Sequence, residues 1–558
     1  MKKKILIFLI ALIFSFIPFY RIFFKNGIIA NIDFTQFFLF NPNFLERYPY
    51  VWNEYFSGAF NIFYIVNSLA LVLISSFFSF LGLSVLWINR FWLVFPFFLY
   101  IISVYFFIKT FLKEFNFSLL EIILFLAFAV FSPLTSHYLS LGWQEAYFLP
   151  LAGTFFMFSF FFKFLESFTF KDFLFALLFS LLSVQLMHFF IFANICFFIY
   201  IFLFKDLSLL KKVKIFFIWL VGLFFVNSWW IFPLLSSYFS NKIVNYRYNP
   251  IIDIEYLKNV ISFKDVLFLN QARGTSIIQK YQLDAHIAII RTIFPILFII
   301  GHLQATKKKE LLKKSLFLGV MAVLLIFFGA GMHPPFGKIF TWAFINVPMF
   351  YMFRDIGKMG LLLSFIYGIF AVYLFKKFSA KSNSRKILGT LVIFIFLSVS
   401  SYPLITGNLM GDLQPLKLPD EYLEISSIID NSKQDFKVLN LPMPEWCSKF
   451  SWMEDKEKGA QIFNPFYSLL SKPIIFDELK NTGLNSVQKL SVFLACKGDQ
   501  KQLKLLPLLN IGKLIFQKDQ LNKPVEFCSN DELLKKVDTV FFKEKTGNFV
   551  NLYSLPDK

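Results

Sequence analysis

A short stretch before an apolar run holds three ionisable residues that could bind a charged substrate. Residues 349–363 read MFYMFRDIGKMGLLL, with Arg354 and Lys358 four positions apart and Asp355 beside them. In a helix this spacing puts both cations on one face. A guanidinium binds phosphate through two parallel hydrogen bonds, and a lysine adds a second positive charge. Because charge beside hydrocarbon is costly and generally functional, we predict that Arg354 and Lys358 bind a lipid-linked phosphate. The alternative is that they are anchors that extend to the headgroups.

Carboxylates and aromatic residues gather in other segments that could line a substrate site. The segments are IIANIDFTQFF with Asp33, RYPYVWNEYFSG with Trp52 and Glu54, LGWQEAYFLP with Trp143, Gln144 and Glu145, and GMHPPFG with His333. Taken alone, Asp33 is more simply an interfacial residue or a helix cap. Tryptophan and tyrosine at this depth usually form an interfacial belt, and residues 143–145 could be a solvated turn. Aromatic residues beside carboxylates can also form the floor of a sugar site, and that interpretation stays open.

The composition indicates a chain that crosses a membrane many times. Of 558 residues, 57% are hydrophobic and 84 are phenylalanine, and several apolar runs reach the roughly 20 residues that span a bilayer. The run over residues 5–24 follows Lys2, Lys3 and Lys4 and lacks a small-x-small cleavage site, so we predict a retained first helix rather than a signal peptide. The net charge of +20 lies mostly in short loops between the runs. Such loops face the cytoplasm, which explains the charge without nucleic acid as a partner.

The basic loops allow the chain to be threaded through the membrane. We predict about eleven transmembrane helices, with the N-terminus inside and residues 60–82 lying along the outer surface, because one more crossing there would put the next basic loop outside. The predicted outer loops are residues 25–59, 138–145, 236–285 and 332–355. Irregular polar backbone at membrane depth survives where it lines a watery cavity. We therefore expect a cavity that opens outward from the transmembrane domain, residues 1–404.

Residues 405–558 change character and predict a separate mixed α/β domain outside the membrane. Short apolar strands appear in FKVLNLP and KLIFQKD, and TVFFKEKTGNFVNLYSL reads as a hairpin with Thr546-Gly547-Asn548 near its turn. Cys447, Cys496 and Cys528 lie in this part and permit one disulfide at most. Their spacing does not resemble a metal site.

The stretch around Arg354 resembles a segment of the GT-C-type membrane glycosyltransferases, especially the arabinofuranosyltransferase-like branch that modifies bacterial lipid-linked glycans. The similar part reads GMHPPFGKIFTWAFINVPMFYMFRDIGKMGLLLSFIYGIF, with a proline-proline turn, an aromatic helix and then Phe353, Arg354 and Lys358. Other pieces agree in order: LGLSVLWINRF, NSWWIFPL, LPDEYLEISSIID and LLNIGKLIFQKD. The resemblance covers nearly the whole chain. It implies a polytopic α-helical GT-C-like fold followed by an extracytoplasmic α/β domain.

The resemblance also implies a reaction, namely transfer of a sugar on the outer face of the cell membrane from a polyprenyl-phosphate donor. The acceptor would be a glycan, a lipid or a protein. An acidic residue of the first outer loop is typically the base in this family, which gives that role to Asp33 and leaves Glu54 and Glu145 as alternatives. One base and an in-line displacement would invert the anomeric centre. Trp52, Trp143, Gln144, His333 and Asp355 are the expected substrate contacts. No cofactor is assigned, and a divalent cation stays open.

Two other classes of function remain as alternatives. A flippase or transporter could use the same cations to escort a lipid phosphate, but it would need polar residues at the middle of several spans. The predicted spans are mostly Phe, Leu and Ile. A non-catalytic assembly or glycan-binding protein would not need Asp33 to face Arg354.

Overall fold

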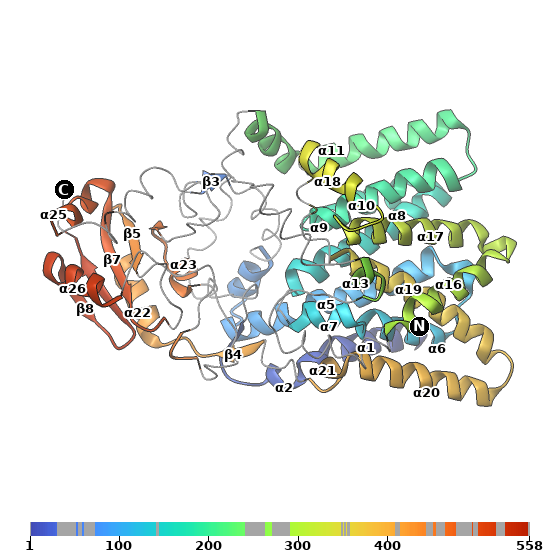
Figure 1. Cartoon of the computed structure of the whole chain (residues 1–558), viewed down its shortest axis with the longest axis horizontal. Helices are drawn as coiled ribbons and strands as arrows, with labels where there is room; N and C mark the ends of the chain where they lie inside the picture. Colours follow the sequence, from blue (N-terminus) through green and yellow to red (C-terminus); the bar gives the residue numbers. More distant parts are fainter. Residues whose placement is uncertain are drawn as a thin grey trace. The chain divides into compact units, whose positions relative to one another are not determined.

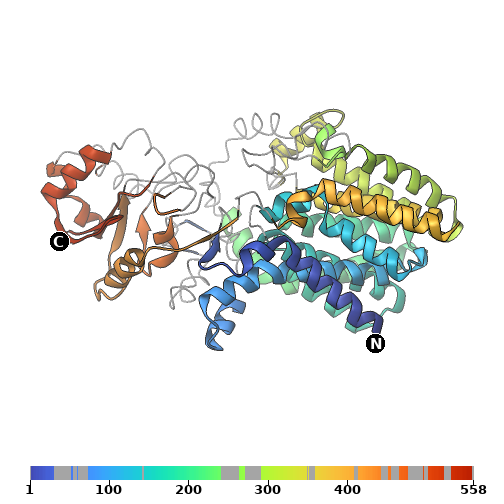
Figure 2. The ribbon, with the colours of Figure 1, turned by 90° about the horizontal axis from the view of Figure 1, so that it is seen from below.

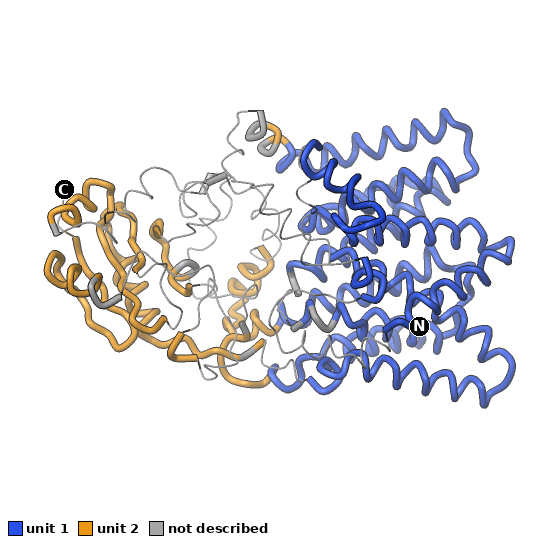
Figure 3. Tube along the Cα trace, in the orientation of Figure 1, with its two compact units in different colours: residues 1–23, 91–231, 249–410 blue, residues 24–90, 232–248, 411–558 orange. Residues whose placement is uncertain are grey.

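The computed structural model divides the chain into two compact units (Figures 1 and 3). Unit 1 holds residues 1–23, 91–231 and 249–410, and unit 2 holds residues 24–90, 232–248 and 411–558. The structure describes residues 2–30, 52–53, 59–60, 73–140, 144–239, 263–269, 291–347, 350, 353, 358–407, 413–441, 450–453, 464–475, 494, 500–520 and 530–555. The C-terminal sheet thus shares a unit with residues 24–90, which include the first predicted outer loop (residues 25–59), whereas the sequence places the domain boundary near residue 405.

Each segment in which the sequence predicts a span contains a helix. These are α1 (Lys2–Phe16), α5 (Val85–Thr110), α6 (Leu119–Val130), α8 (Leu149–Ser167), α9 (Phe170–Ser183), α10 (Met187–Ile199), α11 (Leu209–Phe239), α16 (Ile293–Thr306), α17 (Lys309–Ala330), α19 (Met359–Ser379) and α20 (Asn383–Ser400). Among the described residues, eight helices are long and apolar enough to cross a membrane. Three further helices are shorter, at 12 residues for α6 and 14 each for α9 and α16. A count of eleven spans therefore stays a prediction. Of the predicted surface segment 60–82, residues 73–80 are helical.

The helices of unit 1 run roughly side by side and pack around α19 (Figures 1 and 2). This helix is almost entirely buried and contacts α6, α16, α17 and α20. Small residues bring the backbones close, because a Cβ on Gly301 would lie 2.6 Å from the carbonyl oxygen of Phe370. Ring contacts fill the remaining space. Phe107, Phe155 and Phe365, from three helices, touch one another with centroids 4.4–5.5 Å apart.

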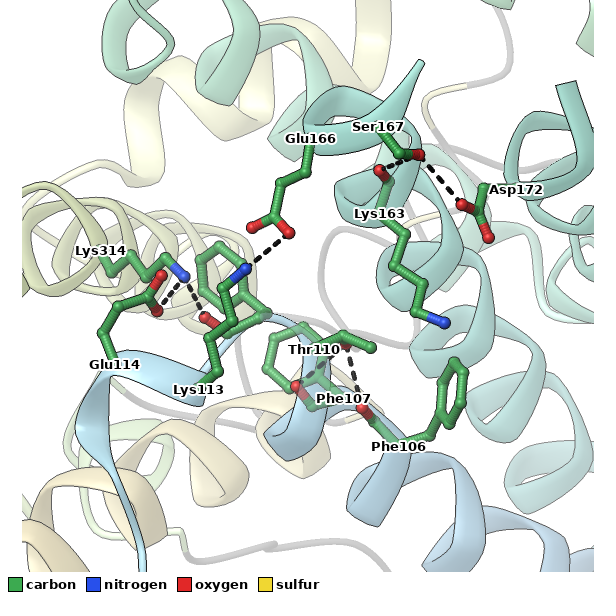
Figure 4. Close-up of polar contacts among 11 residues, drawn as sticks. Phe106, Phe107, Thr110, Lys113, Glu114, Lys163, Glu166, Ser167, Asp172 and Lys314 are labelled. Carbon is green, nitrogen blue, oxygen red and sulfur yellow. Dashed lines mark hydrogen bonds and ion pairs between the residues drawn. The ribbon is translucent and has the colours of Figure 1, made fainter. Parts of the chain in front are cut away.

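Basic loops that the sequence places on one side of the membrane meet at one end of unit 1. Lys113, after α5, pairs with Glu166 of α8 at 2.7 Å, and Lys314 of α17 pairs with Glu114 (Figure 4). The last turn of α19 joins them, because the Lys376 ammonium donates to the carbonyl oxygen of Phe115 at 2.7 Å. The distribution of Lys and Arg in the sequence predicts that these loops lie at the same end of the helices.

Unit 2 holds a five-stranded mixed sheet in the order β6-β5-β7-β9-β8. Its strands are β5 (Lys437–Leu441), β6 (Ile474–Ile475), β7 (Ile511–Gln517), β8 (Phe542–Thr546) and β9 (Val550–Ser554), and its helices include α22 (Asp420–Asp430) and α26 (Asn530–Val540). β5 runs parallel to β6 and β7, and β9 runs antiparallel to β7 and β8. The predicted hairpin is confirmed as β8–β9. Apolar residues from the strands and from α22 and α26 form two hydrophobic cores in unit 2.

Candidate substrate site

Most of the residues that the sequence assigns to substrate lie outside the described part of the chain. Asp33, Glu54, Trp143, Arg354 and Asp355 are outside it. For Trp52, in the two-residue strand β2 (Trp52–Asn53), and for Gln144 and Glu145, in the π-helical turn η5 (Gln144–Phe148), the structure describes the backbone. Lys358 and His333 are described with their side chains. The geometry of the site therefore rests on these two residues and on what holds their neighbours.

Lys358 stands at the start of α19 and contacts the turn that leads into α8. Its ammonium nitrogen lies 4.9 Å from the centre of the Tyr147 ring, a cation–π distance. Tyr147 in turn stacks on Tyr138 of α7 (Pro133–Ser140), with centroids 4.8 Å apart and an interplanar angle of 24°. Both tyrosines are buried. The structure thus brings Lys358 next to η5, the turn whose first two residues are Gln144 and Glu145.

Phe353, the residue before Arg354, is held in an aromatic cluster. Its ring stacks on Phe328 of α17 with centroids 5.2 Å apart, and it meets the His188 ring of α10 edge-on at 5.5 Å. Phe350 packs against Phe353 at 5.2 Å as well. The chain is therefore fixed at Phe353 and again at Lys358. No local sequence signal marks the position of His188 next to Phe353.

His333 follows α17 in the proline-rich segment that the sequence assigns to substrate binding. Its backbone N–H donates to the carbonyl oxygen of Ala330 at 3.0 Å, and its side chain is half-buried. The Nε2 atom is buried and has no hydrogen-bond partner in the part of the chain that the structure describes. A buried ring nitrogen in this state needs a water or a ligand group as a partner. Within the same part, no cluster of three or more His, Cys, Asp or Glu could hold a metal ion.

In unit 2, two residues of α5 hold the start of the first predicted outer loop. The Asn89 side chain accepts from the N–H of Ile29 at 3.0 Å and donates to its carbonyl oxygen at 3.1 Å. Arg90 donates to the carbonyl oxygens of Lys25 at 2.8 Å and Gly27 at 2.7 Å. The next strand, β1 (Ile28–Ala30), pairs with β4 (Gln414–Leu416). Asn89 and Arg90 lie in LGLSVLWINRF, so the resemblance pointed to this segment without giving either residue a role.

The comparisons with solved structures show the fold. The chain is similar to the arabinofuranosyltransferase AftD from Mycobacteria, with a TM-score of 0.63, 12% identity, and coverage of 99% of this chain and 40% of that one. A mutant of AftD matches with the same TM-score and 13% identity, over 99% and 41% of the two chains. The fold is the GT-C fold. The predicted class, a polytopic helical protein with a C-terminal α/β part, is confirmed.

The match to AftD covers less than half of that protein. At 12% identity it shows a shared fold, and the chain spans about two fifths of the length of AftD. The oligosaccharyltransferase AglB from Archaeoglobus fulgidus also matches, with a TM-score of 0.47, 9% identity, and coverage of 92% and 69%, a likeness too weak to carry an argument. No family model matches the sequence, and no curated protein does.

Proposed function

We propose that this protein is a membrane glycosyltransferase that moves a sugar from a polyprenyl-phosphate donor to a glycan, lipid or protein acceptor outside the cytoplasm. The observation that carries the proposal is the anchoring of Phe353 and of Lys358 within a GT-C fold. Phe353 is held by Phe328 and His188, and Lys358 by Tyr147. Arg354 stands between these two fixed points in the sequence. A cationic segment held at both ends suits an anionic group whose position must be exact.

The proposed chemistry is a single displacement at the anomeric carbon. The acceptor oxygen bonds to this carbon while the bond from the carbon to the phosphate oxygen breaks, and the lipid phosphate leaves with the electron pair. Arg354 would hold the phosphate through two hydrogen bonds, and Lys358 would offset its growing charge. Asp33 would take the hydroxyl proton, with Glu54 and Glu145 as alternatives. Trp52, Trp143, Gln144, His333 and Asp355 would contact the substrates. One displacement inverts the anomeric configuration.

The proposed orientation follows from the two ends of unit 1. The end that gathers Lys113, Lys314 and Lys376 is assigned to the cytoplasm. Lys358 stands at the start of α19, which ends near Lys376. Tyr147 precedes α8, which ends near Glu166. Both are therefore assigned to the outer end, together with Tyr138, which stacks on Tyr147. The N-terminus is then inside, and the C-terminal α/β part is outside.

Transport of a lipid-linked sugar is less well supported, because several buried polar groups of the spans pair with one another. Asn227 of α11 donates to Ser180 of α9 at 3.1 Å and accepts from Trp230 at 3.0 Å. Thr154 and Ser183 share a hydrogen bond of 2.7 Å. Groups that are satisfied in this way stabilise helix contacts rather than form a polar path.

A transfer assay tests the proposal. Purified protein in lipid nanodiscs receives a panel of radiolabelled polyprenyl-phosphate sugars and membrane extracts as the acceptor source. Label that moves from the lipid fraction to an extracted glycan, lipid or protein supports the proposal. Flip of the label across a vesicle membrane, with no new glycosidic bond, would favour a transporter.

A further inference from the structure

The turn between α9 and α10 places two buried polar side chains at the end of unit 1 assigned to the outside. α9 ends at Ser183 and α10 begins at Met187. Gln185 is 6% exposed and His188 is 8% exposed. The Oε1 atom of Gln185 is buried and has no hydrogen-bond partner among the described residues. An acceptor oxygen buried at this depth costs free energy until it meets a donor.

This turn lies next to the segment proposed to bind the donor. The His188 ring meets the Phe353 ring edge-on, with centroids 5.5 Å apart and an interplanar angle of 87°. Phe353 directly precedes Arg354 in the sequence. The first turn of α10 is therefore a neighbour of the proposed phosphate-binding segment, although the two are separated by more than 160 positions along the chain.

The start of α10 has the polarity that an anion requires. The helix runs for 13 residues from Met187 to Ile199, and its N-cap residue is Leu186, whose side chain makes no capping hydrogen bond. The first N–H groups of a helix have no i−4 partner within the helix. In α10 the N–H of Phe189 donates to the carbonyl oxygen of Leu186 at 2.9 Å, and the N–H groups of Met187 and His188 come before it. They carry partial positive charge and bind phosphate in many proteins. In a membrane protein, where water is scarce, such groups need a partner from the protein or from a ligand.

We propose that the first turn of α10 is part of the donor site. The backbone N–H of Met187 and the His188 imidazole donate to the phosphate that the proposed function assigns to Arg354 and Lys358, and Gln185 Oε1 accepts a hydrogen bond from a hydroxyl of the attached sugar. The phosphate oxygens accept hydrogen bonds and therefore match the N–H donors of α10. A sugar hydroxyl can donate a hydrogen bond and therefore matches the oxygen of Gln185. The inference rests on the proposed function for the identity of the ligand. It adds two residues to which the sequence gave no role in the site.

Binding of undecaprenyl phosphate, which carries no sugar, tests the phosphate part without any turnover. Binding to the full-length protein is measured in phosphatidylcholine nanodiscs. We expect His188→Leu to weaken it about tenfold, the worth of one hydrogen bond to a charged group. His188→Gln keeps a side-chain N–H and should retain most of the affinity. Gln185→Met should weaken binding of a polyprenyl-phosphate sugar more than binding of undecaprenyl phosphate, because Gln185 is assigned to the sugar.

His302→Leu is the matched control. His302 is also on a helix of unit 1, where it bonds to Ser315 at 3.1 Å and stacks on Phe298 near the end of α16 that leads into Lys307. This variant should therefore bind like the parent. Equal affinity of His188→Leu and the parent would overturn the inference, and so would a parent that binds no undecaprenyl phosphate.

Replacing phosphatidylcholine by phosphatidylglycerol in the nanodiscs separates the two sources of lipid phosphate, the donor and the phospholipid headgroups. Loss of undecaprenyl phosphate binding there would assign the site to phospholipid headgroups and overturn the donor assignment.

Crosslinking covers the case in which a His188 variant does not fold. Undecaprenyl phosphate with a diazirine beside its phosphate is irradiated on the unmodified protein, and we expect adducts at residues 185–190. Adducts that exclude this turn would contradict the inference. The transfer assay on the same preparation separates the two claims. A parent that crosslinks at α10 but transfers no sugar refutes the proposed function alone, whereas transfer without a dependence on His188 refutes the inference alone.

Discussion

The ammonium nitrogen of Lys358 lies 4.9 Å from the ring centre of Tyr147, and this contact joins the start of α19 to the turn before α8. The Tyr147 ring also stacks on the Tyr138 ring. A buried tyrosine pair thus serves as a platform for a cation that the sequence assigns to phosphate binding. The platform limits where Lys358 can place its charge, which is what stabilisation of a departing phosphate requires.

Removal of the platform should weaken donor binding. Tyr147→Leu loses the cation–π contact, worth about 0.5–2 kcal/mol, so the KM for the donor should rise about 3- to 30-fold. Tyr147→Phe keeps the ring and should stay close to the parent. Tyr200→Leu is the control, because that tyrosine packs on Phe317 at the end with the basic loops. If Tyr147→Leu and the parent have the same KM for the donor, the position of Lys358 on Tyr147 has no part in donor binding.

Arg354 should matter more than Lys358 for use of a lipid-phosphate sugar. Only arginine offers a planar two-pronged contact with phosphate, so Arg354→Ala should lose more catalytic efficiency than Lys358→Ala in the transfer assay. Lys381→Ala, an exposed cation between α19 and α20, should be neutral. Full activity of Arg354→Ala would remove phosphate binding from this segment.

The proposed orientation predicts opposite labelling at two exposed positions. Lys381→Cys lies in the loop after α19, and Lys433→Cys follows α22 in unit 2. In intact cells, in a background without the four native cysteines, a membrane-impermeant maleimide should react with Lys433→Cys only. Reaction at Lys381→Cys before permeabilisation would reverse the orientation or change the span count.

The sequence predicted the elements whose signals are local. Apolar runs located the long helices because burial in lipid requires them to be apolar throughout. The β8–β9 hairpin was visible because Gly547 falls between two alternating strands. The fold requires a glycine at position 547, because a Cβ there would clash with the Glu421 carboxylate. This carboxylate accepts hydrogen bonds from the N–H of Asn548 at 2.9 Å and from the N–H of Val550 at 2.6 Å.

Contacts between distant segments could not be predicted in this way. Ile28 pairs with Leu416 across two strands of three residues each. Strands this short have no sequence pattern from which their pairing could be predicted. The stack of Tyr138 on Tyr147 depends on the π-helical turn that contains Tyr147, and no local signal marks that turn. The position of His188 beside Phe353 is of the same kind.

Asp519 should give unit 2 a pH-dependent stability. Its carboxylate is 3% exposed and accepts a hydrogen bond from the Tyr422 hydroxyl at 2.5 Å. Burial raises the pKa of Asp519 from 3.8 to about 6, so between these values the folded state binds more protons than the unfolded state. Asp519 therefore costs stability at neutral pH, about 3 kcal/mol for a shift of this size. This cost disappears as the pH falls from 7 toward 4.

Comparison with Asp519→Asn isolates this effect from the other carboxylates. The amide keeps an oxygen that can accept from Tyr422 and does not titrate. We expect the melting temperature of the parent, relative to Asp519→Asn, to rise as the pH falls from 7 to 4 and to level off below it. Asp435→Asn, at an exposed position, should show no such trend. A constant difference between the parent and Asp519→Asn would contradict the assigned pKa.

The most direct test of the proposed function is the turnover of Asp33→Asn in the transfer assay. The asparagine keeps the size of the side chain but cannot take the acceptor proton. If Asp33 is the base, transfer should fall by about 10² to 10⁴, while the melting temperature and the affinity for undecaprenyl phosphate stay at the values of the parent. Asp33→Glu should recover part of the rate. Near-normal turnover by a well-folded Asp33→Asn would contradict the account and move the search for the base to Glu54 and Glu145.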